Sequence, residues 1–145
     1  MSYSPREEYV LARLFKRYVV ALPVKLEPSY PEWTSFACVM IAGEVFEKVG
    51  FLDEGYFMYY EDVDFCARAR RSGYRIVNIP DSHVVHLRGG SSPVKSNAAA
   101  RKRLPRYYYE SRTRYFYRHR GHLGLLAANI LWSVGWCIAC ARSKF

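Results

Sequence analysis

The sequence lacks the features of a secreted protein. Its beginning has no uninterrupted apolar run that could act as a secretory signal, because charged residues break it: Arg6, Glu7, Glu8, Arg13, Lys16 and Arg17. Only four residues are cysteine, and they lie in apolar segments, as buried thiols in a reducing compartment do. Cys137-x-x-Cys140 has the spacing of a metal or redox pair, but no second Cys/His pair lies beside it. We therefore expect a cytoplasmic protein without a disulfide framework or a zinc site.

Acidic residues are scarce in one part of the chain. Between residues 101 and 120 there are eight Lys or Arg and one acid, Glu110, which leaves this stretch with +7 of the total charge of +9. Such a charge favours an anionic partner, which can be nucleic acid, a phosphorylated substrate or an acidic membrane surface. The segment 123–141 then has no charged residue at all and is nearly as long as the ~20 residues that span a bilayer. An interfacial or packed helix is the alternative to a span.

The pattern of apolar and turn residues predicts alternating helices and strands. Half of the 145 residues are hydrophobic, enough for the core of one domain or of a piece of a larger one. We expect an amphipathic helix near the start that ends at Pro23, helices over 44–49 and 61–72, and strands over 36–41, 74–79 and 82–86. This alternation is typical of the α/β class.

The stretch from Gly50 to Cys66 holds the strongest candidates for chemistry. Three acids, Glu61, Asp62 and Asp64, directly follow the bulky run 56–60, so they are expected near the core. Carboxylates held in this way can bind substrates or transfer protons. Acids in a first helical turn also favour the helix dipole, so a purely structural helix start explains them equally well.

Several ordered motifs between Trp33 and Ser92 resemble one known family. The motifs are Trp33-Thr-Ser-Phe-Ala-Cys, Glu44-Val-Phe-Glu-Lys-Val-Gly50, Leu52-Asp-Glu54, Phe57-Met-Tyr-Tyr-Glu-Asp-Val-Asp64, Arg68-Ala-Arg-Arg-Ser-Gly-Tyr-Arg-Ile76, Pro80, Val84-Val-His86 and Gly89-Gly-Ser-Ser92. They resemble the C-terminal half of the catalytic domain in family 2 glycosyltransferases, inverting GT-A enzymes that include many bacterial rhamnosyl- and galactofuranosyltransferases. The resemblance implies the C-terminal part of a Rossmann-like GT-A domain of the α/β class, followed here by a basic and apolar helical tail.

The resemblance also implies roles for individual residues. Asp62 matches the catalytic base that takes the proton from the acceptor hydroxyl, and a carboxylate at a helix start is expected to stay ionised, as a base requires. Trp33 matches a segment that lines the acceptor site, and Glu61 and Asp64 are expected to support acceptor binding. His86 matches a ligand of the divalent metal, Mg or Mn, that neutralises the donor diphosphate, and the resemblance implies that the donor half of the enzyme binds most of this metal. A loop near the donor phosphates matches Gly89, Gly90, Ser91 and Ser92.

The chain departs from the family pattern in two ways and also contains one misleading motif. The residues before Trp33 contain no nucleotide-binding βαβ unit and no upstream Asp-x-Asp motif, so we expect a fragment whose donor half is supplied elsewhere and which is inactive alone. Asp62-Val63-Asp64 has the form of that metal motif but stands at the position of the base, so it is not interpreted as a metal site. Phe36 replaces a usual glycine, and its ring is expected to crowd the backbone or the acceptor pocket.

These observations divide the chain into three parts. Residues 1–32 are expected to form an amphipathic helix and a Pro-rich linker, residues 33–100 the acceptor-side half of the catalytic domain, and residues 101–145 a basic aromatic segment with an apolar, membrane-associating helix. The expected partners are a nucleotide-sugar donor, a glycan or lipid-linked acceptor and the anionic cytoplasmic face of a membrane. Two alternatives remain: a nucleic-acid-binding module that uses Arg and Tyr of 101–120, or a non-catalytic membrane scaffold.

Overall fold

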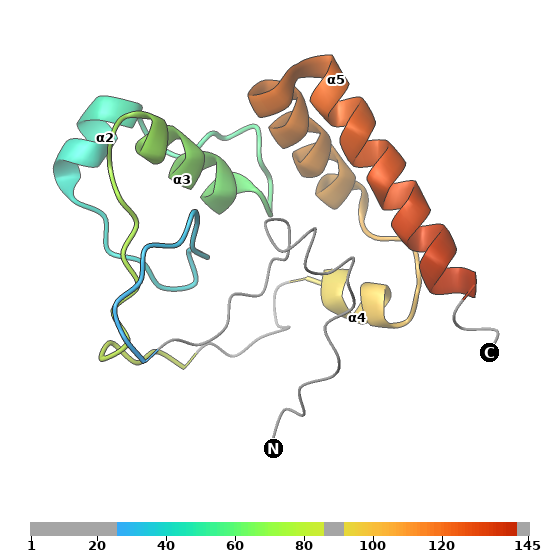
Figure 1. Ribbon diagram of the computed structural model, residues 1–145, viewed down its shortest axis with the longest axis horizontal. Coiled ribbons are helices and arrows are strands. Elements are labelled where there is room, and N and C mark those ends of the chain that lie inside the picture. The colour runs from blue at the N-terminus through green and yellow to red at the C-terminus, as the bar shows by residue number, and fades with distance from the viewer. Residues whose placement is uncertain (1–25, 86–91, 142–145) are drawn as a thin grey trace.

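The computed structural model describes residues 26–85 and 92–141, which form four helices. Helices α2 (Gly43–Val49) and α3 (Glu61–Arg71) lie on one side of the molecule, and α5 (Arg106–Ala141) lies on the other, with the short α4 (Val94–Ala99) beside the start of α5 (Figure 1). Helices α2 and α3 confirm the two helices that the sequence predicts in this region. The amphipathic helix expected near the start lies outside the described residues.

A small aromatic core joins α2 to α3. Val45, Phe65 and Ala69 are buried, and partly buried hydrophobic residues surround them: Phe36, Ile41, Phe46, Val49 and Tyr74. The ring of Phe65 lies 5.6 Å from that of Phe36, measured between centroids, and 5.4 Å from that of Phe46. Phe36 therefore fills the core beside α3, where its large ring adds apolar contact area.

None of the three strands predicted from the sequence forms among the described residues. The only β-type pairing there is an isolated antiparallel bridge, in which Ser29 and Asn78 exchange backbone hydrogen bonds of 3.2 and 2.8 Å. A strand needs a neighbour that satisfies its backbone groups and covers its apolar side chains, and here Val77, Ile79 and Val85 stay exposed. The α/β class thus remains a prediction, and the described residues are mainly helical.

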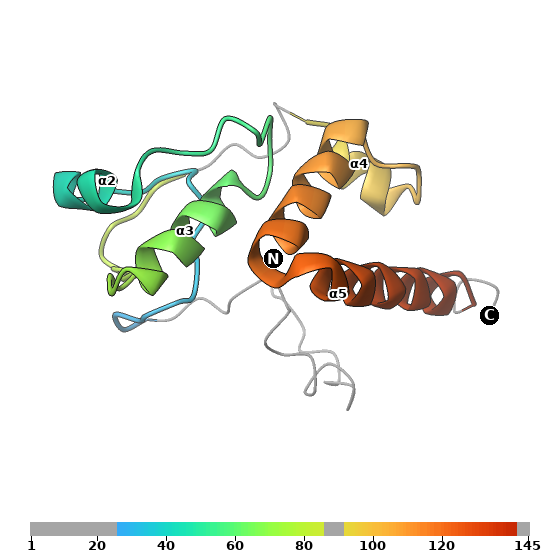
Figure 2. The same ribbon diagram turned by 90° about the horizontal axis from the view of Figure 1, so that it is seen from above.

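Helix α5 is a hairpin of two helical arms. Gly121 interrupts it with φ 64° and ψ −166°, a backbone conformation that is essentially limited to glycine. We call residues 106–120 the first arm and residues 122–141 the second arm. The second arm folds back beside the first in the view of Figure 1, and Figure 2 shows that the two arms diverge from the bend at a wide angle.

Arg112 fastens the two arms to each other. This first-arm residue is buried, and its guanidinium donates to the Asn129 side-chain oxygen at 2.7 Å and to the Ala128 carbonyl at 2.6 Å. The same guanidinium lies about 5 Å from the ring centroids of Phe116 and Trp132. A buried cation held by two acceptors and two rings makes the hairpin a defined unit, because separating the arms would leave those groups unpaired.

Candidate functional site

The backbone before α3 adopts an unusual conformation. Tyr59 and Tyr60 both have positive φ, 69° and 70°, and Tyr60 is the N-cap of α3 without any side-chain capping bond. Left-handed geometry in two consecutive non-glycine residues costs on the order of 1–3 kcal/mol each. Surrounding contacts must therefore hold this turn in place, directly before the candidate acids.

The first arm of α5 supplies these contacts. The hydroxyl of Ser111 donates to the carbonyl of Met58 at 3.0 Å. The rings of the two strained tyrosines pack against first-arm rings at centroid distances of 5.4 to 6.5 Å; the partners are Tyr107, Tyr108, Tyr115 and Phe116. The tail thus determines the shape of the turn that leads into α3.

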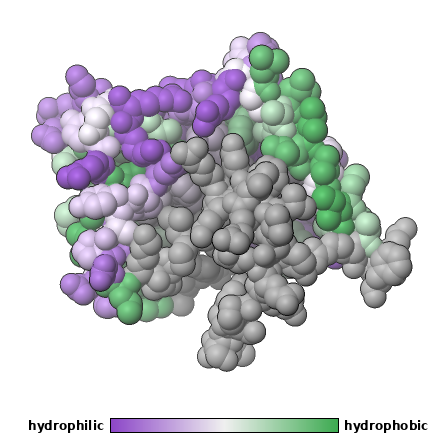
Figure 3. Space-filling model, viewed as in Figure 1, coloured by the Kyte–Doolittle hydropathy of each residue, from purple (hydrophilic) through white to green (hydrophobic). Residues whose placement is uncertain are grey.

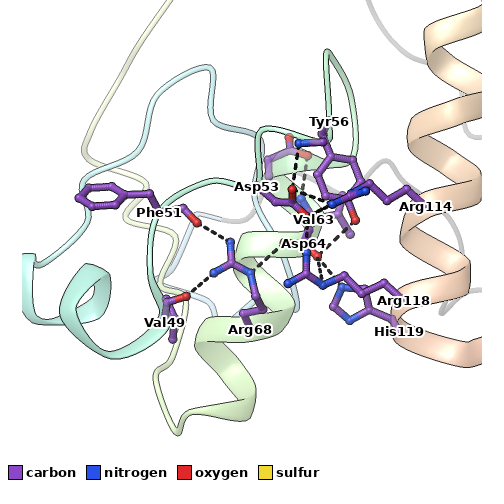
Figure 4. Close-up of polar contacts among 12 residues, drawn as sticks. Val49, Phe51, Asp53, Tyr56, Val63, Asp64, Arg68, Arg114, Arg118 and His119 are labelled. Carbon is purple, nitrogen blue, oxygen red and sulfur yellow. Dashed lines mark hydrogen bonds and ion pairs between the residues drawn. The ribbon is translucent and has the colours of Figure 1, made fainter.

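Asp64 connects α3 to the first arm through a network of buried hydrogen bonds (Figure 4). Its side chain is fully buried, and one oxygen accepts from Arg68 Nε at 2.8 Å. The other oxygen accepts from His119 Nε2 at 2.7 Å and from the Tyr56 hydroxyl at 3.3 Å. Burial would raise the pKa of Asp64, but the hydrogen bonds from His119 and Arg68 outweigh it and hold that pKa below its ordinary value.

Asp53 forms a second link to the same arm. Arg114 binds both of its carboxylate oxygens at 2.9 Å, and Arg118 pairs with it as well. Burial would raise the pKa of Asp53, but the Gly55 amide and the two arginines lower it overall. Unlike the buried Asp64 network, this cluster lies near the surface, since both arginine side chains are nearly half exposed.

Asp62 is different, because among the described residues no Lys, Arg or His forms an ion pair with it. The side chain is half-buried, and its Oδ1 accepts from the Val63 amide at 2.8 Å. Burial raises the pKa of Asp62, and backbone amides, including that of Phe36, oppose this shift only in part. The structure therefore leaves this carboxylate unneutralised and makes it a stronger base than an ordinary aspartate.

The neighbouring Glu61 also has an unsatisfied carboxylate. Its Oε2 atom is buried and has no hydrogen-bond partner within residues 26–85 and 92–141. Burial raises the pKa of Glu61, and the nearby charge of Asp62 adds to the increase. A buried acceptor without a partner is costly, so a polar group that reached this position from outside would be favoured.

Asp62 and Asp64 cannot act as one metal site. Two residues apart on an α-helix, they point to roughly opposite sides, and both oxygens of Asp64 already accept hydrogen bonds. In the described part of the chain, no three His, Cys, Asp or Glu side chains come together in a way that could hold a metal ion. The one metal ligand that the family resemblance implies for this chain, His86, lies outside the described residues.

The remaining predicted residues lie elsewhere or outside the described ranges. Trp33 is half-buried and precedes the turn that contains Phe36. Ser92 lies before α4, where its hydroxyl is 2.8 Å from the Tyr107 hydroxyl and accepts from the Val94 amide at 3.2 Å. His86, Gly89, Gly90 and Ser91 fall outside the described residues.

The sequence reasoning missed the first-arm residues that bind the acids. Arg114, Arg118 and His119 appeared only as part of a basic surface, whereas the structure points them at Asp53 and Asp64. Arg114 and Arg118 are four residues apart and hence share one helix face, which was a usable signal for an acidic partner segment. These cations are therefore paired with acids of the same chain, whereas binding to nucleic acid would require them to contact phosphates.

Comparisons with known proteins identify the family. Residues 16–141 match the family described as glycosyl transferase family group 2. A low-salt glycan biosynthesis hexosyltransferase of Haloferax volcanii is 49% identical over 49 residues, 34% of this chain and 15% of that protein. An N-acetylglucosaminyl-diphospho-decaprenol L-rhamnosyltransferase of Mycobacterium tuberculosis is 37% identical over 83 residues, which cover 54% and 27% of the two chains.

A dTDP-rhamnosyl transferase of Shigella flexneri is 34% identical over 88 residues, 60% of this chain and 30% of that protein. The chain thus spans less than a third of the length of each of these relatives. No solved structure matches it. The family match, which covers most of the chain, shows that it belongs to glycosyl transferase family group 2.

Proposed function

We propose that this chain forms the acceptor side of a glycosyltransferase, with Asp62 as the general base. The enzyme would transfer a sugar from a nucleotide-sugar donor to a glycan or lipid-linked acceptor, as the names of the relatives suggest. The observation that carries the proposal is the contrast among the acids of one segment. Asp53 and Asp64 are paired with cations, whereas Asp62, beside a strained turn, is not.

The proposed reaction is a single displacement. The acceptor hydroxyl oxygen forms a bond to the anomeric carbon of the donor while the bond from that carbon to the diphosphate breaks. The hydroxyl proton moves to Asp62, and the electron pair leaves with the nucleoside diphosphate. One displacement inverts the configuration at the anomeric carbon, and a base whose pKa is raised by burial holds the proton better as the bond forms.

The neighbouring residues have supporting roles in this proposal. The unpaired Oε2 of Glu61 is suited to accept a hydrogen bond from an acceptor hydroxyl, and Trp33 to line the same site. Asp64 has no free oxygen, so we assign it to the positioning of α3 instead of to acceptor contact. His86 and the loop with Gly89, Gly90, Ser91 and Ser92 remain proposed contacts to a divalent metal and to the donor phosphates.

The proposed location is the cytoplasmic face of a membrane. Within the described residues, α5 is the one helix long and apolar enough to cross a membrane, judged by length and composition, and almost none of its apolar part is buried. Attachment of this helix to a membrane would bring the α3 site near lipid-linked acceptors. The GT-A fold and the three-part division of the chain belong to the same proposal.

Turnover should require more than these 145 residues. Because the chain spans less than a third of its relatives, we expect no product when it is incubated alone with nucleotide sugar and lipid-linked acceptor. Fusion to the remaining, donor-binding part of a rhamnosyltransferase relative should give product, measured as transferred radiolabelled sugar. Product from the chain alone would refute the proposal that the donor-binding half is missing. A folded fusion without product, over a panel of donors, would refute the assignment as an acceptor side.

A further inference from the structure

An exposed apolar stripe runs along the second arm of α5. It consists of residues three or four positions apart, which share one helix face: Leu123, Leu126, Ile130, Val134 and Ile138. Each is between 46% and 82% exposed. Figure 3 shows the second arm as a continuous hydrophobic band at the edge of the molecule. A contiguous apolar surface of this kind marks an interaction site.

Part of the opposite side of the second arm contacts the first arm, and Trp132 on that side is still 40% exposed. The carbonyl of Ala128 and the side chain of Asn129 accept from Arg112 in the first arm. The Trp132 ring lies 6.2 Å from the Tyr108 ring and 6.4 Å from the Tyr109 ring. The stripe therefore points away from the first arm and from the α3 site behind it.

The hairpin geometry disfavours a simple membrane span by the second arm. Contacts between the arms extend from the Gly121 bend as far as Trp132. If the second arm crossed a bilayer, Arg112, which is bound to Ala128 and Asn129 of that arm, would enter the hydrocarbon with its charge. Each charged residue at the centre of a bilayer costs roughly 3 kcal/mol or more. An arm that lies in the plane of the interface avoids this cost.

Cations beside the hairpin indicate the charge of the partner surface. Arg101, Lys102 and Arg103 precede the first arm, are exposed, and have no acidic partner among the described residues. An open groove of about 660 Å³ joins this region to the second arm, with Arg103, Arg106 and Leu125 among its lining residues. Cations next to an apolar helix complement anionic headgroups, each contributing about 1 kcal/mol near the surface.

We propose that the second arm lies flat in the interface of an anionic bilayer, with the stripe in the acyl region and the first arm above it. The occupant of the stripe is thus the lipid surface. This inference refines the membrane attachment of the proposed function and rests on it. It implies that the hairpin holds the α3 site at a fixed height above the membrane, because the first arm binds both the second arm and Asp64.

Vesicle binding tests the partner and needs no nucleotide sugar, so its outcome is independent of transfer activity. The chain should float with vesicles of phosphatidylcholine and phosphatidylglycerol, and high salt should weaken this binding. Ile130→Glu combined with Val134→Glu should weaken it at least about tenfold, because two charges enter the acyl region. Met40→Glu, at a residue 98% exposed outside α5, is the matched control and should bind like the wild type. Equal binding by the double variant, or no binding by the wild type, would refute the proposal.

Tryptophan depth distinguishes a flat arm from a spanning one. In a Trp33→Phe background, the remaining tryptophans are Trp132 and Trp136, near the middle of the second arm. A flat arm keeps them shallow, so lipids brominated near the headgroup should quench their fluorescence more than lipids brominated near the acyl ends. A spanning arm would place them near the bilayer centre. Stronger quenching by the deep bromines would therefore overturn the flat orientation even if the vesicles bind.

Discussion

Replacing Asp62 by asparagine in the active fusion should reduce transfer by about 10²–10⁴-fold, the usual contribution of a general base. Asparagine keeps the shape and can still accept from the Val63 amide, but it cannot take a proton. The effect should appear in kcat, while donor binding stays near that of the wild type. Initial rates of sugar transfer and equilibrium titration with the nucleotide sugar measure the two quantities separately.

The same substitution should leave stability unchanged or increase it. Burial raises the pKa of Asp62, which means that the folded state disfavours its charge, and asparagine removes that charge. Glu47→Gln, at an exposed acid of α2, is the matched control and should affect neither activity nor stability. Wild-type turnover by Asp62→Asn would exclude Asp62 as the base. Loss of activity together with unfolding would indicate a structural role instead.

A pH profile provides an independent test of the same role. The base acts only when it is ionised, so kcat/KM should fall as the pH decreases through the pKa of Asp62. Since that pKa is raised, the fall should begin at a higher pH than for an ordinary aspartate. The acidic limb should be lost with the Asp62→Asn variant. An acidic limb that persists in this variant would belong to another group.

The sequence predicted the local helices well because their signals are local. Acids at the start of α3, arginines at its end and the Gly50 stop after α2 act within one or two turns of chain, and both helices form where expected. The predicted strands do not form among the described residues, because a strand depends on a distant partner. The isolated bridge between Ser29 and Asn78 satisfies one pair of residues and leaves apolar neighbours such as Ile79 exposed.

The spacing of the acids in the sequence could not predict which of them are paired with cations and which are not. Glu61, Asp62 and Asp64 lie within one helical turn, and their different environments come from a first arm about fifty residues further along the chain. His119 and Ser111 occur there without any motif that links them to α3. The strained φ of Tyr59 and Tyr60 was equally hidden, because no glycine indicates it.

Replacing Asp64 by alanine should destabilise the fold by about 3–5 kcal/mol, the cost of breaking a buried ion pair. The change leaves Arg68 and the largely buried His119 without their shared acceptor. Asp53→Ala is the matched control, because Asp53 also binds two cations, but these are arginines whose side chains are nearly half exposed. An ion pair with such an exposed partner contributes only about 0–1 kcal/mol. Urea unfolding followed by circular dichroism measures the free energy of unfolding of each variant. Equal destabilisation would contradict the explanation by burial.

The dependence of stability on pH tests whether the charge of Asp64 causes its stabilising effect. Its pKa is lower in the folded protein than the ordinary value of 3.8, so the unfolded chain binds the proton more readily. The stabilisation is therefore fully present above that ordinary value and is lost as the pH falls below it. The Asp64→Ala variant should lose less stability than the wild type over this acidic range. Parallel acid curves for the two proteins would mean that Asp64 joins α3 to α5 without its charge, and that other carboxylates cause the acid unfolding.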